Sequence, residues 1–292
     1  MLIETFEVDR VMKHWRNFFE IPVVNEFQNV SSFSLVKCKK CGLQFFYPKI
    51  VGSEGFYREL QKFDWYYMRN KWEHKVALQD LKSGFKVLEV GCGFGDFMAQ
   101  AQKKGIDIEG IELNKAAVRV AKDQGLSVRY LDLKEILKDH TKTYDAVCSF
   151  QVLEHILDPK EFFKHSIMLL KQGGKLIISV PNADSFIQYA KGNLLDQPPH
   201  HISRWSKRVF EVIPKHFPLA LQRVLYEPLA SYHLEWYVDI QLNRLLHVRF
   251  LTGFVYRLIR KLVLTLTRRT GWYRFLRGHS IYVCFQKINS LS

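Results

Sequence analysis

The C-terminal part of the chain contains no aspartate or glutamate. Residues 240–292 lack acidic side chains altogether but hold ten of the 43 lysines and arginines. The net charge of +14 therefore comes mainly from this tail, and residues 1–239 carry a net charge of only +4. Because the body of the protein is nearly neutral, its composition argues against a surface built throughout for nucleic acid.

Cysteines and long apolar runs are also scarce. The five cysteines are an odd and mostly scattered set, which fits a reducing compartment. Acidic residues at Glu4, Glu7 and Asp9 interrupt the N-terminus, so we expect no signal peptide. The longest uncharged stretch of the tail helix, residues 262–267, is far shorter than the roughly 20 residues that span a bilayer. We therefore expect a cytoplasmic protein, and its 47% hydrophobic content supports a sizeable core.

A glycine-rich turn after an apolar strand is the most informative motif. Residues 85–90 have the pattern of a buried strand, and Gly91, Gly93 and Gly95 follow at alternate positions. Glycine permits a turn with positive φ and lets a ligand approach the backbone closely. The next helix would aim its free N–H groups at that ligand. Glu112 ends the second strand, where a carboxylate can accept both hydroxyls of a ribose.

The glycine spacing separates two classes of cofactor-binding protein. A G-x-G-x-x-G turn fits the pyrophosphate of a dinucleotide, whereas this chain has G-x-G-x-G with Glu89 two positions before it. This pattern resembles motif I of the class I S-adenosylmethionine-dependent methyltransferases. Residues 144–159, with Leu-Glu-His and Asp-Pro, resemble the fourth-strand motif of that superfamily, and residues 169–182 resemble its Gly-Gly turn and fifth strand. The resemblance implies S-adenosyl-L-methionine as cofactor and methyl transfer as activity.

The pattern of elements agrees with this resemblance. Strands are predicted at residues 85–90, 107–113, 127–131, 144–150 and 175–180, and amphipathic helical segments separate them. Asn114 is predicted to cap a helix that runs to Gln124, and Asp158 and Pro159 are predicted to open one that ends at Gly173 and Gly174. This alternation predicts an α/β fold with a doubly wound, Rossmann-like parallel sheet covered by helices on both faces. The resemblance adds two antiparallel strands, at residues 223–227 and 279–286, and so a seven-stranded sheet. The predicted parts are an N-terminal extension of residues 1–80, a cofactor domain of residues 81–228 and 278–292, and a basic helical insertion of residues 229–277.

The carboxyl ends of these strands predict the cofactor-binding residues, because ligands bind there in such sheets. The glycines would line the methionine and ribose, Glu112 would bind the ribose hydroxyls, and Asp132 would lie near the adenine amine or else cap a helix. The predicted set is Glu89, Gly91, Cys92, Gly93, Gly95, Glu112, Leu113, Asp132, Leu133 and Gln151.

Three histidines are the predicted catalytic residues. His200 and His201 follow paired prolines in a loop, so we do not expect both to face a core. In related methyltransferases a comparable segment lies near the acceptor mouth. Histidine titrates near neutrality, so His200 or His201 could take a proton from an acceptor hydroxyl, or could only bond the loop backbone. His155, which follows the fourth strand, could instead order the floor of the pocket.

The N-terminal extension contains a Cys-x-x-Cys-Gly knuckle at Cys38 and Cys41. A structural zinc site needs four ligands, and no second pair precedes this one. Many bacterial sugar and cell-envelope methyltransferases, of methyltransferase type 11 or 23, carry two such pairs. The chain resembles them with the first pair replaced, so no metal site is predicted. Aromatic residues Trp65, Tyr66 and Tyr67 could cover the sulfonium by cation–π contact or pack between the extension and the sheet.

A basic amphipathic helix is predicted in the tail. Its apolar side consists of Leu251, Phe254, Val255, Leu258, Ile259, Leu262 and Leu266. Its basic side consists of Arg249, Arg257, Arg260, Lys261 and Arg268. Such a helix could lie on an anionic membrane surface, with Trp272, Tyr273 and Phe275 as anchors. It could instead pack against the cofactor domain, or bind RNA or another polyanion. Membrane contact would make the protein peripheral on the inner face of the cell membrane.

The predicted reaction is an in-line attack of an acceptor oxygen or carbon on the methyl group, in which positioning dominates catalysis. The resemblance and the tail favour a saccharide, a nucleotide-linked sugar or a lipid-linked glycan of the cell envelope, and so a role in polysaccharide biosynthesis. One alternative is an RNA methyltransferase, although the Asn/Asp-Pro-Pro-Tyr/Phe motif for exocyclic nitrogens is missing. The other is a non-catalytic, membrane-associated scaffold that binds S-adenosylmethionine.

Overall fold

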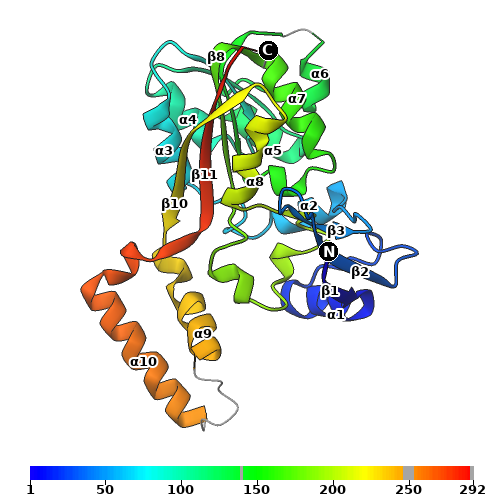
Figure 1. Cartoon of the computed structure of the whole chain (residues 1–292), viewed down its shortest axis with the longest axis vertical. Helices are drawn as coiled ribbons and strands as arrows, with labels where there is room; N and C mark the ends of the chain where they lie inside the picture. The colour runs from blue at the N-terminus through cyan, green and yellow to red at the C-terminus, as the bar shows by residue number, and fades with distance from the viewer. Residues whose placement is uncertain (139–140, 246–252, 290–292) are drawn as a thin grey trace.

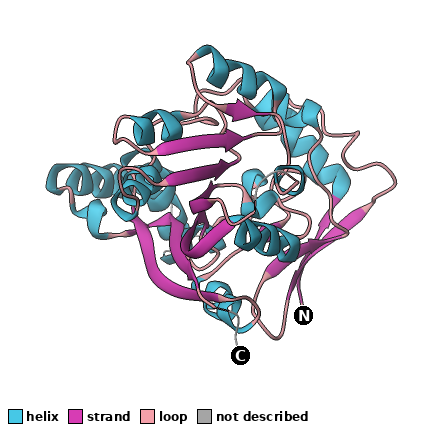
Figure 2. Ribbon diagram, turned by 90° about the horizontal axis from the view of Figure 1, so that it is seen from above, coloured by secondary structure: helices cyan, strands magenta, loops and turns pink. Residues whose placement is uncertain are grey.

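Two β-sheets organise the chain in the computed structural model, which describes residues 1–138, 141–245 and 253–289. The larger sheet has the strand order β10-β11-β8-β7-β4-β5-β6, and the smaller one the order β1-β2-β3-β9. Figures 1 and 2 show the large sheet with helices packed around it and the small sheet beside it, next to the N-terminus. The predicted α/β class with a seven-stranded sheet is confirmed.

Parallel strands form the centre of the large sheet. Its members are β4 (Lys86–Val90), β5 (Asp107–Ile111), β6 (Val128–Arg129), β7 (Tyr144–Phe150), β8 (Leu170–Pro181), β10 (Leu219–Pro228) and β11 (Arg277–Lys287). The five strands from β6 to β8 run parallel, whereas β11 is antiparallel to β8 and β10 to β11. The strand order reverses between β4 and β7, and a crevice for ligands forms at the carboxyl ends of strands at such a point.

Helices cover both faces of this sheet because its strands are apolar on both sides. The helices α3 (Trp72–Asp80), α4 (Asp96–Gln102) and α5 (Lys115–Asp123) pack on one face. The helices α6 (Leu133–Ile136), α7 (Pro159–Leu169) and α8 (Lys207–Val212) pack on the other. Residues 72–80 thus contribute to the core of the large sheet, and the division of the chain into three parts stays a prediction.

Side-chain caps begin two of these helices where the sequence predicts them. The Asn114 side chain accepts hydrogen bonds from backbone N–H groups in the first turn of α5. The Asp158 side chain does the same in the first turn of α7, which has proline at its first position. The prediction that the latter helix reaches Gly173 and Gly174 was wrong. It ends at Leu169, because β8 begins at the next residue and pairs with β7.

The N-terminal segment forms its own aromatic core. It contains β1 (Leu2–Glu7), α1 (Val8–Phe19), β2 (Ser32–Lys37), β3 (Gln44–Tyr47) and α2 (Glu54–Leu60). Trp15, Phe33 and Phe46 are fully buried in this core. The short strand β9 (Ser203–Arg204) pairs with β3, although it comes from the segment that follows the predicted histidine loop. The small sheet therefore holds one end of that loop.

A helical hairpin projects from the edge of the large sheet (Figure 1). It consists of α9 (Leu234–Leu245) and α10 (Gly253–Thr270), with short helical turns at Ser231–His233 and Trp272–Phe275. The two helices share a small hydrophobic cluster to which α10 contributes the buried Leu264. No helix in the described ranges has the length and apolar character that crossing a membrane requires.

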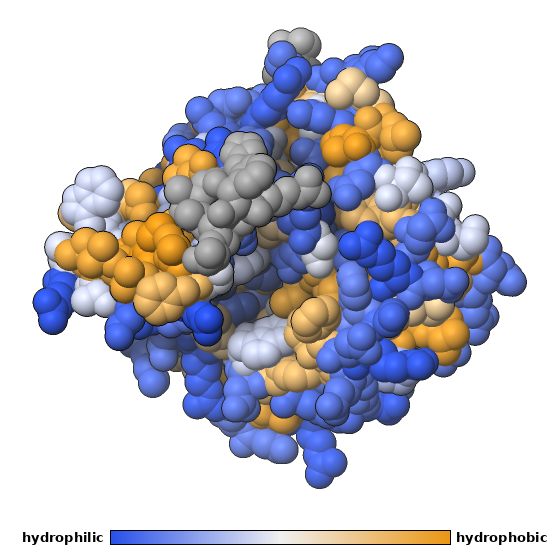
Figure 3. All heavy atoms as spheres, turned by 90° about the horizontal axis from the view of Figure 1, so that it is seen from below, coloured by the Kyte–Doolittle hydropathy of each residue, from blue (hydrophilic) through white to orange (hydrophobic). Residues whose placement is uncertain are grey.

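The surface of α10 differs in part from the prediction. A row of apolar side chains at Phe254, Leu258, Leu262 and Leu266 is 70, 59, 58 and 54% exposed. Arg260, predicted on the basic side, instead faces α9 and binds Asp239 and Glu235. This difference follows from the acidic residues of α9, which the wheel of a single helix cannot include. Figure 3 shows apolar side chains on this projecting part of the molecule. Leu251 and Arg249 lie outside the described residues.

Candidate active site

A large cavity of ≈ 1420 Å³ lies at the carboxyl ends of β4, β5 and β7. It exceeds the roughly 300–1,000 Å³ of an ordinary small-molecule pocket, so a cofactor and an acceptor fit side by side. Every residue of the predicted cofactor-binding and catalytic sets lines it except Gly95. A Cβ on Gly95 would come within 2.2 Å of Leu126, so this glycine serves close packing at the start of α4.

The glycine turn is shaped for close approach to a ligand. Gly91 and Gly93 adopt φ values of +72° and +53°, which side-chain-bearing residues rarely adopt. A Cβ on Gly93 would lie 2.8 Å from the Tyr67 ring, and one on Gly91 would lie 2.4 Å from Val152. The wall of the cavity here is therefore bare backbone, as binding of a nucleoside-type cofactor requires.

Glu112 holds the glycine turn in place. One carboxylate oxygen accepts from the Gly93 N–H at 2.9 Å, and the other accepts from the N–H groups of Leu113 and Asn114 at 2.8 and 2.9 Å. Burial raises the pKa of this carboxyl. A carboxylate offers about four acceptor positions and these three donors use three of them, so Glu112 keeps capacity for one ribose hydroxyl. Its position at the cavity agrees with the prediction, and its contact with a ribose stays a prediction.

Glu89 supplies a further polar group in the cavity wall. It is almost fully buried, and its Oε2 has no hydrogen-bond partner among the residues that the structure describes. Burial raises the pKa of this carboxyl well above its usual range. A buried polar atom without a partner is costly, and a donor from a bound cofactor would satisfy it. The residues present thus fit an adenosine-type cofactor with a charged amino acid portion.

Asp132 and Gln151 reach the cavity with their side chains already engaged. Asp132 caps α6, and its carboxylate and that of Glu135 each accept from the other residue's N–H, at 2.7 and 2.8 Å. The structure thus shows the helix-capping alternative, and contact with adenine stays a prediction. The Gln151 amide donates to Glu73 at 3.1 Å and to Ser179 at 3.3 Å.

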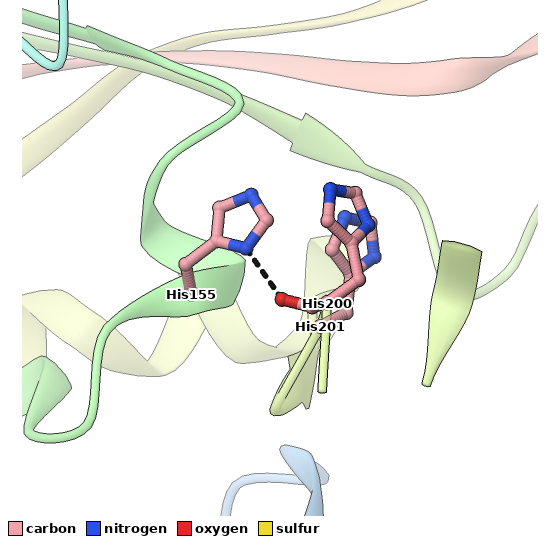
Figure 4. Close-up of side chains that lie close together, drawn as sticks. All are labelled: His155, His200 and His201. Carbon is pink, nitrogen blue, oxygen red and sulfur yellow. Dashed lines mark hydrogen bonds between the residues drawn. The ribbon is translucent and has the colours of Figure 1, made fainter. Parts of the chain in front are cut away.

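The three predicted catalytic histidines come together at the other end of the cavity (Figure 4). His155 follows β7, and His200 and His201 precede β9. The rings of His200 and His201 are stacked, with centroids 4.4 Å apart, and the two residues are only 7 and 8% exposed. The expectation that both cannot face the interior was therefore wrong. Polar partners explain the burial, because each ring has an oxygen atom within hydrogen-bonding distance.

Those oxygens come from neighbouring segments. His155 Nδ1 lies 2.6 Å from the His200 carbonyl oxygen, and His200 Nδ1 lies 2.8 Å from the Leu195 carbonyl oxygen. His201 Nδ1 lies 3.3 Å from the Asp196 carboxylate. Burial lowers the pKa of all three histidines, that of His155 to about 4. The imidazoles are therefore neutral near pH 7.

Sequence reasoning missed two polar residues beside this cluster. Glu154 is 1% exposed, and its carboxylate lies 3.9 Å from His201 Nε2. Burial raises the pKa of Glu154 to about 8. The Tyr57 hydroxyl lies 3.2 Å from His155 Nδ1. The Leu-Glu-His motif contained the signal for Glu154, whereas nothing local in sequence connects Tyr57 with residues about a hundred positions later.

The aromatic residues 65–67 divide between the two predicted positions, beside the glycine turn and against the N-terminal segment. Tyr67 lies over the glycine turn, with its ring 4.3 Å from that of Phe94, and its hydroxyl accepts from Asn114. Tyr66 packs against the N-terminal core and also lines the cavity. Trp65 stacks on Phe63 and is 40% exposed. Tyr67 is thus the aromatic residue placed to cover a ligand on the glycine turn.

The cysteines of the N-terminal knuckle lie in the turn between β2 and β3. Both thiols are free and half-buried. Within the described ranges, the groups of three or more potential metal-ligating residues consist of the histidine cluster and include neither cysteine.

Comparisons with known proteins agree with this geometry. A family model described as a methyltransferase domain matches residues 65–224. The mitochondrial ubiquinone biosynthesis O-methyltransferase of Bos taurus is 30% identical over 186 residues, which cover 56% of this chain and 50% of that protein. The ubiquinone biosynthesis O-methyltransferase of Xanthomonas oryzae is 33% identical over 106 residues, which cover 34 and 44%. The chain spans about half the length of the curated relatives it matches.

Solved structures share the fold. One is a chain of the complex between the Haloferax volcanii Trm112 methyltransferase activator and a methyltransferase, with a TM-score of 0.51 and 17% identity over 75% of this chain and 90% of that one. Another is the YcgJ protein of Bacillus subtilis, with a TM-score of 0.50 and 14% identity over 75% of this chain and 99% of that one.

Proposed function

The chain belongs to the class I S-adenosylmethionine-dependent methyltransferases, and from this premise we propose that it methylates a hydroxyl oxygen of a small-molecule acceptor. The observation that carries this proposal is the continuous cavity, which joins the glycine turn to the histidine cluster. Relatives named as O-methyltransferases support oxygen as the methylated atom.

The two ends of the cavity have different roles in the proposed reaction. When bound, S-adenosylmethionine supplies a methyl group whose bond to sulfur breaks as the acceptor oxygen forms the new bond, and the electron pair stays on sulfur. Glu112 and the backbone of Gly91 and Gly93 would hold the nucleoside and fix the direction of attack. Such positioning can supply about 7–11 kcal/mol of the barrier reduction.

The histidine cluster is proposed to orient the acceptor. His200 Nε2 has no hydrogen-bond partner in the described parts of the chain, and the residue lines the cavity. This nitrogen can accept from the acceptor hydroxyl, whose proton must leave during methyl transfer. The rings of His155 and His201 pack against the His200 ring, with centroids 4.8 and 4.4 Å from its centroid. We therefore keep His155, His200 and His201 as the catalytic residues of the proposal.

We propose a lipid-linked acceptor whose hydroxylated headgroup, a glycan or a hydroxylated ring, enters the cavity. The support comes from the helical hairpin, which contributes Tyr232, His233 and Trp236 to the cavity wall. An apolar tail could thus leave the cavity along the hairpin while the headgroup reaches the histidines. A nucleotide-linked sugar is the competing acceptor, because it carries no lipid.

Methyl-labelled S-adenosylmethionine tests both proposals. The purified protein would be incubated with a cell extract separated into lipid, polysaccharide, nucleotide-sugar, RNA and protein fractions, with Glu112→Ala as the matched control. Label in the lipid fraction, absent with the variant, is the expected result. Label in nucleotide sugars would overturn the lipid-linked acceptor, and label in RNA would replace the proposed function. Cofactor binding without transfer to any fraction would favour the scaffold.

We also propose that α10 lies on the anionic surface of a membrane, which would make a cytoplasmic protein peripheral on the inner face of the cell membrane. Its exposed apolar row supports this proposal, because side chains of this kind bury in the interfacial region of a bilayer. Arg257, Lys261 and Arg269 are exposed on the same helix and would attract acidic headgroups. Trp272 and Phe275, 64 and 84% exposed, follow as interfacial anchors.

Sedimentation with liposomes of stated charge tests this membrane contact. We expect salt-sensitive binding to vesicles that contain phosphatidylserine, and its loss when Arg257, Lys261 and Arg269 are changed to glutamine. A matched variant with Lys103, Lys104 and Lys122 changed to glutamine loses the same net charge but leaves α10 unchanged. Equal loss in both variants, or no binding by the intact protein, would refute the proposal.

A further inference from the structure

Three imidazoles from two separate segments converge within the cavity wall. Each of His155, His200 and His201 offers a potential ligand atom, and these atoms lie within 4.8 Å of one another. Their ring centroids are 4.4 to 4.9 Å apart. Figure 4 shows the His155 ring beside the stacked rings of His200 and His201, with one nitrogen of His155 turned to the His200 carbonyl and the other turned away from it.

The hydrogen bonds of these rings decide which nitrogen is free. The carbonyl oxygens beside His155 Nδ1 and His200 Nδ1 can only accept, so both Nδ1 atoms must carry hydrogen. His201 Nδ1 has the Asp196 carboxylate as its partner. A neutral ring with hydrogen on Nδ1 keeps a lone pair on Nε2. Metal-binding histidines show this arrangement, in which a carbonyl or carboxylate fixes one nitrogen and the other binds the ion.

Glu154 supplies an independent observation. Neither of its carboxylate oxygens has a hydrogen-bond partner among the described residues, and the side chain is almost completely buried. His200 Nε2 is likewise buried without a partner there. The Glu154 carboxyl lies 3.9 Å from His201 Nε2, so both unpartnered groups belong to the wall at the histidine cluster, where buried polar atoms without a partner are costly. A cation satisfies both, because both are electron-pair donors.

We infer that His155, His200 and His201 form a binding site for a divalent transition-metal ion, with Zn²⁺ as the best-suited ion and the Glu154 carboxyl beside it. Three imidazole nitrogens are ligands that Zn²⁺ prefers, and they leave the fourth position of a tetrahedral ion open. Zinc lies about 2.0–2.1 Å from each nitrogen, so two nitrogens on one ion are at most about 4.2 Å apart. The observed spread of up to 4.8 Å requires small side-chain rotations to close.

This site deepens the proposed function and rests on it for its role in catalysis. A zinc ion can accept a further ligand from the cavity, and a hydroxyl oxygen bound there loses its proton more readily. The histidines would then act by holding the ion rather than by taking the proton, which would leave to solvent through the cavity. Binding of the ion itself does not depend on the identity of the acceptor.

Metal binding by the full-length protein tests the inference without reference to activity. Chelator-treated protein would be titrated with Zn²⁺ by calorimetry and with Co²⁺ by visible spectroscopy. We expect one equivalent bound and the intense Co²⁺ bands of a four-coordinate site. His200→Ala and Glu154→Gln should each weaken zinc binding at least tenfold, the first by loss of a ligand and the second by loss of the neighbouring carboxyl group. His216→Ala, at an exposed histidine, and the double change Cys38→Ser, Cys41→Ser should leave it unchanged.

S-adenosylmethionine affinity of each variant shows that its fold is intact, and His200→Gln replaces His200→Ala should the latter unfold. A folded wild-type protein that binds S-adenosylmethionine but no zinc would overturn the inference. Loss of zinc only in the double cysteine variant would overturn it equally. Zinc binding that depends on the histidines, in a protein that methylates no acceptor, would support the metal site while refuting the proposed function. Methyl transfer by a protein that binds no zinc would do the reverse.

Discussion

Replacing Glu112 with alanine should weaken S-adenosylmethionine binding by about 10- to 150-fold. Hydrogen bonds to a charged group are worth about 1.5–3 kcal/mol, and 1.4 kcal/mol corresponds to a tenfold change in Kd. The variant loses the acceptor for ribose hydroxyls, and the carboxylate that accepts from the Gly93 N–H disappears at the same time. Because that hydrogen bond holds the glycine turn, the upper end of this range is the more reasonable expectation.

Calorimetric titration with S-adenosylmethionine measures this loss directly. The matched control is Glu211→Ala, which removes an exposed carboxylate that pairs with Lys207 on α8, away from the cavity wall. We expect an unchanged Kd for the control. An unchanged Kd for Glu112→Ala in a folded protein would remove this residue from the cofactor site, and with it the reasoning that assigns the carboxyl end of β5 to the ribose.

Three further predictions concern the same wall of the cavity. Gly93→Ala should weaken cofactor binding more than tenfold, because its Cβ would meet the Tyr67 ring; Gly84→Ala, at φ +79° with nothing within 4 Å, shares the backbone strain and should leave the Kd unchanged. Because the pKa of Glu112 is raised, S-adenosylmethionine should bind with full affinity above that pKa and lose affinity as the pH falls through it, beginning above the ordinary value of 4.5. If Kd changed with pH in the same way in the wild type and in Glu112→Gln, this expectation would be contradicted. Asn114→Ala removes a helix cap worth about 1 kcal/mol and should lower Tm by about 2–4 °C in a thermal melt; an unchanged Tm would show that the cap contributes nothing.

The sequence predicts the large sheet well because its information is local. The strands β4, β5 and β7 are short segments with buried apolar residues, and helix caps such as Asn114 and Asp158 mark where helices begin. The cofactor end of the cavity follows from the same signals, since the glycine turn and Glu112 lie directly after strands. The end of α7 was misjudged, because the Gly-Gly turn looks like a helix terminus while residues 170–174 already belong to β8.

The histidine end of the cavity depends on contacts between distant segments, which a single sequence does not reveal. His200 and His201 are buried because the Leu195 carbonyl and the Asp196 carboxylate fold back to meet them. Likewise, Arg260 leaves the basic face of its helix because α9 presents acidic side chains to it. In both places the partner decides whether a polar side chain is buried or exposed, and periodicity carries no information about the partner.

The pairing of β9 with β3 gives the N-terminal segment a role in positioning the site. The histidine loop is held on one side by this pairing, at Phe45 and Ser203, and on the other by the hydrogen bond from the Ile202 N–H to the Glu154 carbonyl oxygen. The small sheet and the short helical turn Leu153–His155 after β7 therefore fix the same few residues from opposite sides. Because the Tyr57 hydroxyl of α2 also reaches His155, the N-terminal segment contacts the cluster twice. The histidine end of the cavity is thus built jointly by the large sheet and the small sheet, whereas the glycine-turn end needs the large sheet and the aromatic residues that precede it.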